Sequence, residues 1–322
     1  MPPRNTLERT LVELWERGLG TRPIGIHDDF FELGGTSLLG IQLFTQLPDA
    51  LKGHLKVADL LIEKTIAGLS GRMSGHDPCA LPTGLVLLRP GQGDPIFCPH
   101  ALLGGAVSVY QPLLAHLPTR RQFYGLVAAG LDGSDFPRRT IESMGAAYLE
   151  SIKRLQPRGP YRFLGFSTGG LIAFEIAQRL QAVGDSVARL VLLDARAAAE
   201  FPESVRRGGY ASVLDEFLRP HILQLMPANT PPAEVDPILR VARATAEATF
   251  AYEPRPYAGQ VVFVSPESVD NPFVYPSTPP EAFWGRMAST LELRKVPGNH
   301  YSMMSDANAP ALAQVLTPLL DL

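Results

Sequence analysis

The chain has 322 residues, of which 45% are hydrophobic and 19% charged, and its formal net charge is −3. A charge so close to zero creates no field that would gather nucleic acid, so the composition favours small molecules or proteins as partners. The length exceeds that of one small domain and favours a small domain joined to an enzyme. The longest apolar runs, such as Leu190 to Leu193, are far shorter than the roughly 20 residues that span a bilayer.

The cysteines and the first residues bear on the compartment. Only Cys79 and Cys98 occur, and no short signal-like segment opens the chain. Neither secretion nor a disulfide framework is therefore indicated. We predict a cytoplasmic protein that does not enter a membrane.

The first seventy residues carry a helical pattern. Apolar residues repeat at helical spacing behind a Thr6 cap, and Gly20 follows the pattern. A second apolar stretch fits a helix that starts at Ser37, and a last helix follows. A stretch rich in glycine, proline and small residues comes next and is typical of a linker. We predict a small all-α helical bundle over residues 1–74 and a linker over residues 75–84.

From residue 85 onward, short apolar runs alternate with helical stretches. The runs are LVLLRP, PIFCPH, QFYGLVA, YRFLGFS, ARLVLLDA, QVVFVS and LELRKVPG. This rhythm predicts a mainly parallel sheet covered by helices over residues 85–322. One segment, at about residues 196–256, looks helical and contains no strand, and an insertion of that length is typical of a lid.

A G-x-S-x-G pattern lies between a predicted strand and a predicted helix, with Gly165, Ser167 and Gly169 as its fixed positions. A sharp strand-to-helix turn with small neighbours lifts a serine hydroxyl above the sheet, as in the nucleophile of α/β-hydrolases. The N–H of Thr168, at the start of the helix, is predicted to form half of an oxyanion hole. The alternative is a glycine-rich turn with an incidental serine.

A serine nucleophile needs a base that accepts its proton, and in this fold the base follows the nucleophile in the chain. His300 directly follows a predicted strand and is the candidate base. The other histidine after Ser167 is His221, in the predicted lid, for which a structural role is expected.

Two strand ends offer the acid that would orient the base. Asp194 directly ends an apolar strand, whereas Glu267 and Asp270 lie in a proline-containing loop after a later strand. Either site satisfies the chain order. We prefer Asp194, because the end of a buried strand leaves a carboxylate little freedom.

The second oxyanion donor is expected in the loop PIFCPHALLGG, which follows an early strand. The N–H of Leu102 is the candidate, with that of Ala101 next, and Gly104 allows backbone to approach a ligand closely. Cys98 and His100 in the same loop suggest a Cys/His dyad, but a cysteine at a buried strand end more often serves packing.

The run DDFFELGGTSL, from Asp28 to Leu38, resembles the phosphopantetheine attachment motif of peptidyl carrier proteins, in which a serine follows L-G-G-x at the start of a helix. The resemblance covers Leu7 to about Met73. It implies that Ser37 carries a covalently attached 4′-phosphopantetheine arm.

The surroundings of Ser37 suit that attachment, because backbone amides and the dipole at a helix start favour an incoming phosphate. Asp28, Asp29 and Glu32 provide an acidic approach. Thr36 stands where fatty-acid and polyketide carriers usually have an aspartate, which favours the peptidyl type and leaves a polyketide-type carrier as an alternative. Spacing alone would also allow Ser37 to be a simple helix N-cap.

The rest of the chain, from F-C-P-H to G-N-H, resembles the type I thioesterases of nonribosomal peptide synthetases. The resemblance implies an α/β-hydrolase fold with Ser167 as nucleophile, His300 as base and Asp194 as acid. Ala101 departs from the family, which often has proline after His100, and this affects the expected geometry of the oxyanion loop.

The two resemblances together imply release of a carrier-bound acyl or peptidyl thioester through an acyl-serine, by hydrolysis or by macrocyclisation. They also imply a terminal piece of a larger synthetase, whose partners are upstream condensation and adenylation domains and a phosphopantetheinyl transferase. Two alternatives remain: a free-standing serine esterase with an N-terminal interaction module, and a non-catalytic binding protein on a hydrolase scaffold. Metal-ligand clusters and phosphate-binding loops are not evident in the sequence.

Overall fold

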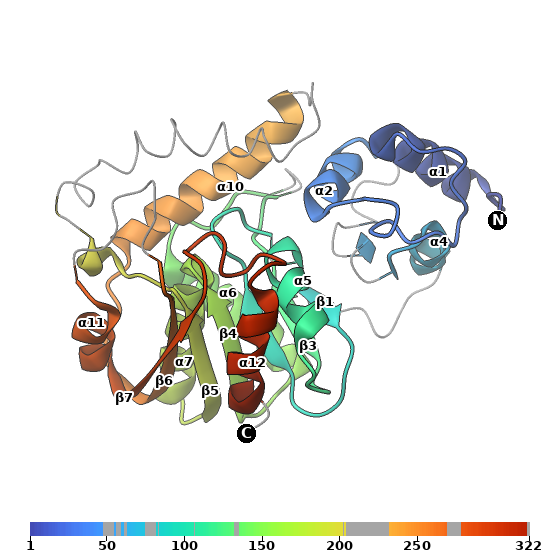
Figure 1. The fold of residues 1–322 in the computed structure, drawn as a ribbon. Coiled ribbons are helices and arrows are strands. Elements are labelled where there is room, and N and C mark those ends of the chain that lie inside the picture. Colours follow the sequence, from blue (N-terminus) through green and yellow to red (C-terminus); the bar gives the residue numbers. More distant parts are fainter. Residues whose placement is uncertain are drawn as a thin grey trace.

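In the computed structural model the chain forms a group of helices and a larger α/β body (Figure 1). The structure describes residues 1–47, 55, 59–60, 63–74, 82, 84–105, 107–131, 135–201, 203, 232–268 and 278–320. Both parts are therefore described, whereas most of the linker predicted over residues 75–84 and, within the lid predicted at about 196–256, residues 202 and 204–231 lie outside the described residues.

The N-terminal part contains α1 (Thr6–Leu19), α2 (Ser37–Thr45) and α4 (Ile66–Ser74). Helix α1 is capped by Asn5, whose side chain accepts a hydrogen bond from the N–H of Glu8, so the prediction of a Thr6 cap was wrong by one residue. Its C-terminus lies at Gly20, which has a φ of 66° and provides the left-handed turn that ends many helices. The predicted helical character of this part is confirmed.

A compact apolar core holds these helices together. Trp15 of α1 and Phe30 of the following loop are fully buried, and their rings meet edge to face with centroids 4.9 Å apart. The other buried members of this core include Leu11, Leu14, Ile26, Leu43, Phe44, Leu60, Ile66 and Leu69. The amphipathic spacing seen in the sequence therefore serves this small core, which is separate from those of the α/β body.

The α/β body is built on a seven-stranded sheet. Its strands are β1 (Leu85–Arg89), β2 (Ile96–Pro99), β3 (Phe123–Leu126), β4 (Tyr161–Phe166), β5 (Val187–Leu193), β6 (Tyr257–Pro266) and β7 (Ala288–Val296). Their order is β1-β3-β2-β4-β5-β6-β7, and only β1 runs antiparallel to its neighbour. Each of the seven apolar runs in the sequence corresponds to one strand, so the prediction of a mainly parallel sheet is confirmed.

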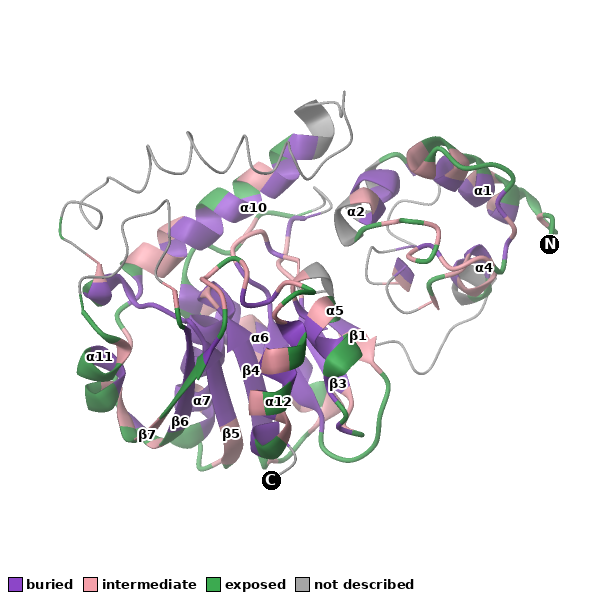
Figure 2. Cartoon of the chain, in the orientation of Figure 1, coloured by how far each residue is buried: buried purple, intermediate pink, exposed green. Residues whose placement is uncertain are grey.

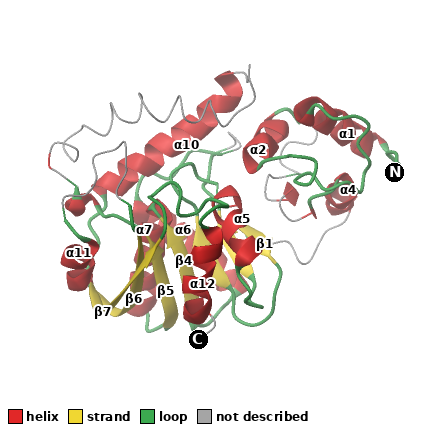
Figure 3. Ribbon diagram, viewed as in Figure 1, coloured by secondary structure: helices red, strands yellow, loops and turns green. Residues whose placement is uncertain are grey.

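Helices cover both faces of this sheet (Figures 1 and 3). One face packs against α6 (Ile141–Leu155), α7 (Thr168–Ala182) and α11 (Pro280–Met287), and the other against α5 (Val107–His116) and α12 (Ala309–Leu320). Figure 2 shows the central strands as buried. Burial on both faces explains why these strands appear in the sequence as continuous apolar runs.

After β5 the chain forms the short 3-10 helix η1 (Ala198–Glu200), and later the long helix α10 (Pro232–Ala251), which lies across one end of the α/β body (Figure 1). One side of α10 packs with Leu131 and partly buried residues that include Leu102 of the loop after β2. Among the described helices, none is long and apolar enough to cross a membrane.

Candidate active site

The turn between β4 and α7 presents Ser167. This residue has a φ of 55° and a ψ of −127°, a conformation that side chains rarely adopt, and its N–H donates to the carbonyl of Leu193 at 2.9 Å. A Cβ at Gly165 would collide with backbone atoms of Gly169 and Gly170. Strand, turn and helix therefore form the tight elbow that the G-x-S-x-G spacing predicts, with the Ser167 hydroxyl free of any capping bond to α7.

A buried tyrosine fixes the elbow from the other face of the sheet. The hydroxyl of Tyr110, in α5, donates to the carbonyl of Pro99 and accepts from the N–H of Phe166, each at 2.9 Å. It thereby joins the C-terminal ends of β2 and β4 and satisfies the N–H of the residue before Ser167. The sequence gives no signal for this contact, because it depends on the packing of α5.

Asp194 lies at the C-terminal end of β5, next to β4. Its φ is 41°, its N–H donates to the carbonyl of Val264 at 2.8 Å, and the residue is 1% exposed. Burial acts to raise the pKa of this carboxyl, but the hydrogen bond and charge of His300 and the charge of Arg196 outweigh it, so the pKa lies below its ordinary value. Asp194 is therefore ionised at neutral pH.

His300 lies on the loop after β7 and meets Asp194 directly. Its Nδ1 is 2.8 Å from Oδ2 of Asp194, and because an ionised carboxylate can only accept, Nδ1 donates. The imidazole also stacks on the ring of Phe166, with centroids 5.0 Å apart and planes inclined by 26°. Since Phe166 directly precedes Ser167, these contacts bring the ring to the elbow with Nε2 available to accept a proton.

The loop that holds His300 is set by its own hydrogen bonds. The Oδ1 of Asn299 accepts from the N–H groups of Tyr301 and Ser302, both at 3.0 Å, and Gly298 has a φ of 94°. The asparagine thus folds the chain back at the position of the histidine. The turn formed by Gly298 and Asn299 therefore accounts for the G-N-H sequence that directly follows β7.

The loop after β2 lies against the start of α7. A Cβ at Gly169 would collide with the carbonyl of Pro99, so the two segments are in close contact. The loop closes in a turn in which Gly104 N–H donates to the carbonyl of Ala101 at 3.0 Å, and this turn does not use the N–H of Leu102. The structure therefore brings the two predicted oxyanion donors, Leu102 and Thr168, to adjoining segments at one end of the sheet.

The other candidates are arranged differently. Glu267 is exposed, and its N–H pairs with the carbonyl of Val296, whereas Asp270 and His221 lie outside the described residues. Of the two carboxylate sites considered from the sequence, the structure brings Asp194 into contact with His300.

Cys98 and His100 are both fully buried. Burial raises the pKa of the Cys98 thiol far above its usual value and lowers the pKa of His100 to about 4. The Nδ1 of His100 is hydrogen-bonded to the carbonyl of Ala101 at 2.8 Å. The geometry therefore supports the packing role for Cys98 and gives no support to a Cys/His dyad.

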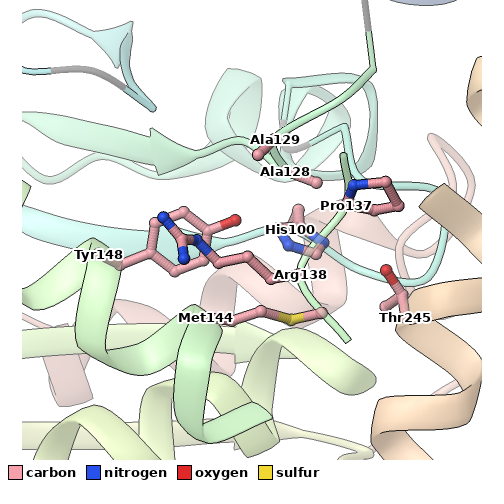
Figure 4. A pocket seen from close by; sticks show the side chains of 8 residues that line it. All are labelled: His100, Ala128, Ala129, Pro137, Arg138, Met144, Tyr148 and Thr245. Atoms are coloured by element: carbon pink, nitrogen blue, oxygen red, sulfur yellow. The ribbon is translucent and has the colours of Figure 1, made fainter. Parts of the chain in front are cut away.

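The His100 ring borders a small cavity of about 10 Å³, the space that a single water needs (Figure 4). The lining residues are His100, Ala128, Ala129, Pro137, Arg138, Met144, Tyr148 and Thr245. Nε2 of His100 and Oγ1 of Thr245 are buried without a partner among the described residues. Because neither Ser167 nor His300 lines it, the cavity is distinct from the nucleophile elbow.

In the N-terminal part, Ser37 is the first residue of α2. The N-cap is Thr36, whose Oγ1 accepts from the N–H of Leu39 at 3.1 Å, so the interpretation of Ser37 as a simple cap is wrong. Gly34 has a φ of 90°, and a Cβ at Gly35 would collide with the Phe30 ring. The glycine pair thus lets the chain turn tightly into α2.

The backbone at the start of α2 suits a phosphate ester. Gly34 and Thr36 are exposed, so the segment that leads into the N-terminus of α2 lies at the surface, and a helix N-terminus favours an anion. Asp28 and Asp29 are partly used within the loop, where they accept from the N–H groups of Gly25 and Phe31. Two of the three acidic residues predicted to lie near Ser37, Asp28 and Asp29, therefore also stabilise the conformation of the loop.

The sheet, its helices and the elbow define an α/β-hydrolase-like enzyme. A family model described as a thioesterase domain matches residues 94–320, and one described as a phosphopantetheine attachment site matches residues 9–73. The chain belongs to the thioesterase domain family and carries in front of it a domain of the kind to which phosphopantetheine is covalently attached. It is a thioesterase.

Curated relatives come from nonribosomal peptide synthesis. The chain is 38% identical over 194 residues to a dimodular nonribosomal peptide synthase of Bacillus subtilis, covering 60% of this chain and 8% of the relative. It is 34% identical over 192 residues to surfactin synthase subunit 3 of the same organism, covering 60% of this chain and 14% of the relative. The chain thus spans only a small part of these relatives' length.

Two solved structures are similar to this chain, one over its whole length and one over the α/β body. A holo four-domain nonribosomal peptide synthetase bound to AMP and glycine matches all of this chain over 26% of its own length, at 27% identity and a TM-score of 0.65. The NocB thioesterase domain from the nocardicin cluster covers 72% of this chain and 96% of its own, at 24% identity and a TM-score of 0.55. The second likeness supports the fold of the α/β body.

Proposed function

We propose that this chain releases an acyl or peptidyl group from a phosphopantetheine arm on Ser37 through an ester on Ser167, with His300 as base and Asp194 as its orienting acid. The observation that carries the proposal is the 2.8 Å contact between His300 and Asp194, with the imidazole stacked on Phe166 at the elbow. The hydrogen bond to Asp194 fixes the tautomer that leaves Nε2 as a proton acceptor.

The proposed domain division is a carrier at residues 1–74, a linker at 75–84 and a thioesterase at 85–322. Separate apolar cores in the helical part and in the α/β body support it. Helix α2 contacts α5, which follows the loop after β2, so the helical part lies on that side of the body (Figure 1). A short tether would keep the carrier at a high effective concentration near the site.

In the first half-reaction the arm supplies an acyl group held as a reactive thioester. His300 Nε2 accepts the proton of the Ser167 hydroxyl as its oxygen attacks the acyl carbonyl. The N–H groups of Thr168 and Leu102 stabilise the resulting oxyanion, and loss of one such donor costs on the order of a hundredfold in rate. His300 then returns the proton to the departing thiol.

In the second half-reaction His300 deprotonates the nucleophile that attacks the ester on Ser167. Water gives a free acid, whereas an amine or hydroxyl of the acyl chain gives a ring. The proposed lid at about residues 196–256 would decide how far water is excluded.

Two contacts, one in the last turn of α10 and one at the residue directly after it, support the proposed lid. Thr249 Oγ1 donates to the carbonyl of Thr245, so it accepts from Thr168 Oγ1, 3.0 Å away. Tyr252 donates to the buried Glu175 of α7 at 2.9 Å. The helix is thereby anchored beside the residue that follows Ser167.

The proposed partners follow from the carrier. A phosphopantetheinyl transferase would load Ser37, and upstream condensation and adenylation domains would supply the acyl chain. The curated relatives, which include a dimodular nonribosomal peptide synthase and a surfactin synthase subunit, support this context. A polyketide-type carrier is the second candidate source, and the residue before Ser37, a threonine, favours the peptidyl source.

A fluorophosphonate probe tests the proposed nucleophile. We expect one covalent adduct, mapped by peptide mass spectrometry to Ser167, and its loss in Ser167→Ala but not in the control Ser186→Ala. His300→Ala should slow both labelling and hydrolysis of a simple acyl thioester by at least about a thousandfold. Labelling that persists in Ser167→Ala, or thioester hydrolysis that survives it, would show that the nucleophile is misassigned.

A further inference from the structure

A buried ion-pair network lies directly behind Asp194. Arg196 Nε donates to Asp194 Oδ1 at 3.0 Å, and its Nη1 donates to Glu200 Oε2 at 3.1 Å. Glu200 Oε1 accepts from the N–H of Ala197 at 2.8 Å. The side chains of Asp194, Arg196 and Glu200 are only 2%, 7% and 0% exposed, so water screens this network very little.

Arg196 determines how the Asp194 carboxylate faces the imidazole. Because Oδ1 is engaged by Arg196, Oδ2 is the oxygen presented to His300. The guanidinium is held in turn by the carbonyl of Thr278 at 3.4 Å and lies over the ring of Phe263, 5.5 Å from its centroid. A planar fork held at several points fixes the rotation of the carboxylate that it binds.

The same arginine carries a charge that disfavours the reaction. When His300 accepts the serine proton it becomes a cation, and Arg196 places a second cation on the same carboxylate. Glu200 opposes the charge of Arg196 when it is ionised. Within the described part of the chain, the charged groups that face Glu200 are Arg196 and Asp194, and those that face Asp194 are Arg196 and His300.

We propose that Arg196 and Glu200 are positioning residues for the reaction: Arg196 orients Asp194, and ionised Glu200 offsets the charge of Arg196 while His300 holds the proton. This inference rests on the triad of the proposed function. Burial raises the pKa of Glu200 to about 7, so the offsetting charge develops close to neutral pH.

The pH profile of kcat/KM distinguishes this role from a structural one. Below about pH 6 Glu200 is largely protonated and resembles glutamine, so wild type and Glu200→Gln should have the same kcat/KM. Above pH 8 wild type should be faster by about three- to tenfold, because its ionised Glu200 favours the imidazolium of the transition state. A purely structural defect would lower kcat/KM by the same factor at every pH.

Arg196→Gln should lower kcat/KM through kcat. Loss of the arginine leaves Asp194 Oδ1 without the guanidinium that fixes the carboxylate, so kcat should fall by about tenfold while KM for the thioester stays nearly unchanged. In Arg196→Gln the further change Glu200→Gln should have no pH-dependent effect, because buried Glu200 stays protonated without the cation that favours its ionised form.

Two controls keep the outcome decisive. Circular dichroism and thermal midpoints check that each variant folds. If Arg196→Gln does not fold, Glu200→Gln alone decides the question, because wild type already has a neutral side chain at position 200 at low pH. A ratio of wild type to Glu200→Gln that stays constant from pH 5 to pH 9 would overturn the inference. Ser167→Ala separates the two claims: activity that survives it contradicts the proposed function, whereas a constant ratio in an enzyme that depends on Ser167 contradicts only the inference.

Discussion

At the residue scale, the site depends on two strained positions at neighbouring strand ends. Ser167 and Asp194 are non-glycine residues with φ values of 55° and 41°, each of which costs about 1–3 kcal/mol. Hydrogen bonds from their N–H groups to Leu193 and Val264, on the next strands, offset that cost. The unusual backbone conformation directs each side chain away from the path of its strand. Both residues lie at the end of the sheet where His300 contacts Asp194.

The ionisation of Glu200 makes the free energy of unfolding depend on pH. Since burial raises its pKa to about 7, from 4.5, the folded state binds more protons than the unfolded state between these values, and stability must fall as pH rises through this range. We expect wild type to lose about 1–3 kcal/mol of unfolding free energy relative to Glu200→Gln between pH 4.5 and pH 8. Urea unfolding at a series of pH values measures this difference, and a constant difference would contradict the raised pKa.

The sequence indicated the residues of the site better than their surroundings. Asp194 was preferred because it directly ends a buried strand, and the structure places it against His300. The roles of Arg196 and Tyr110 were missed, because one depends on an irregular turn after β5 and the other on the packing of α5 against two strand ends. Hydrophobic periodicity carries no information about contacts of either kind.

At the element scale, each strand could be predicted, but their order could not. Burial on both faces produces the apolar runs of β4 and β5, whereas pairing across the sheet depends on segments far apart in the chain. The order β1-β3-β2-β4 needs a crossover that no local pattern records. The start of α1 was predicted to within one residue. Thr6 was the expected N-cap, whereas the N-cap is Asn5, another residue of a type that commonly caps helices.

Tyr110 tests how the elements that frame the elbow are joined. Tyr110→Phe removes a hydroxyl that bonds both Pro99 and Phe166, so a buried carbonyl and a buried N–H lose their partner. We expect the free energy of unfolding to fall by about 2–4 kcal/mol, since each buried group left without a partner costs about 1–3 kcal/mol. Urea denaturation measures this loss.

Tyr148→Phe is the matched control, because among the described residues its hydroxyl bonds the carbonyl of Val127 alone. It should cost less than Tyr110→Phe and leave thioester hydrolysis nearly unchanged, whereas Tyr110→Phe should also lower kcat by loosening the elbow. Equal losses of stability in the two variants would argue against Tyr110 as a double bridge between β2 and β4.

At the scale of the whole molecule, the chain joins a phosphopantetheine attachment domain to a thioesterase domain. The two family matches follow one another along the chain, at residues 9–73 and 94–320. Because the carrier is covalently linked to the thioesterase domain, its effective concentration at the active site is high, and a weak contact between the two domains is sufficient. The approach of α2 to α5 agrees with such a contact.

The most direct test of this account is the intact mass of the chain after a phosphopantetheinyl transferase has transferred acyl-pantetheine from acyl-CoA to it. We predict that wild type gains the arm and loses the acyl group with time, that Ser167→Ala gains the arm and retains the acyl group, and that Ser37→Ala gains neither. An arm that attaches equally well to Ser37→Ala, or an acyl group that leaves Ser167→Ala as fast as wild type, would contradict the central claim.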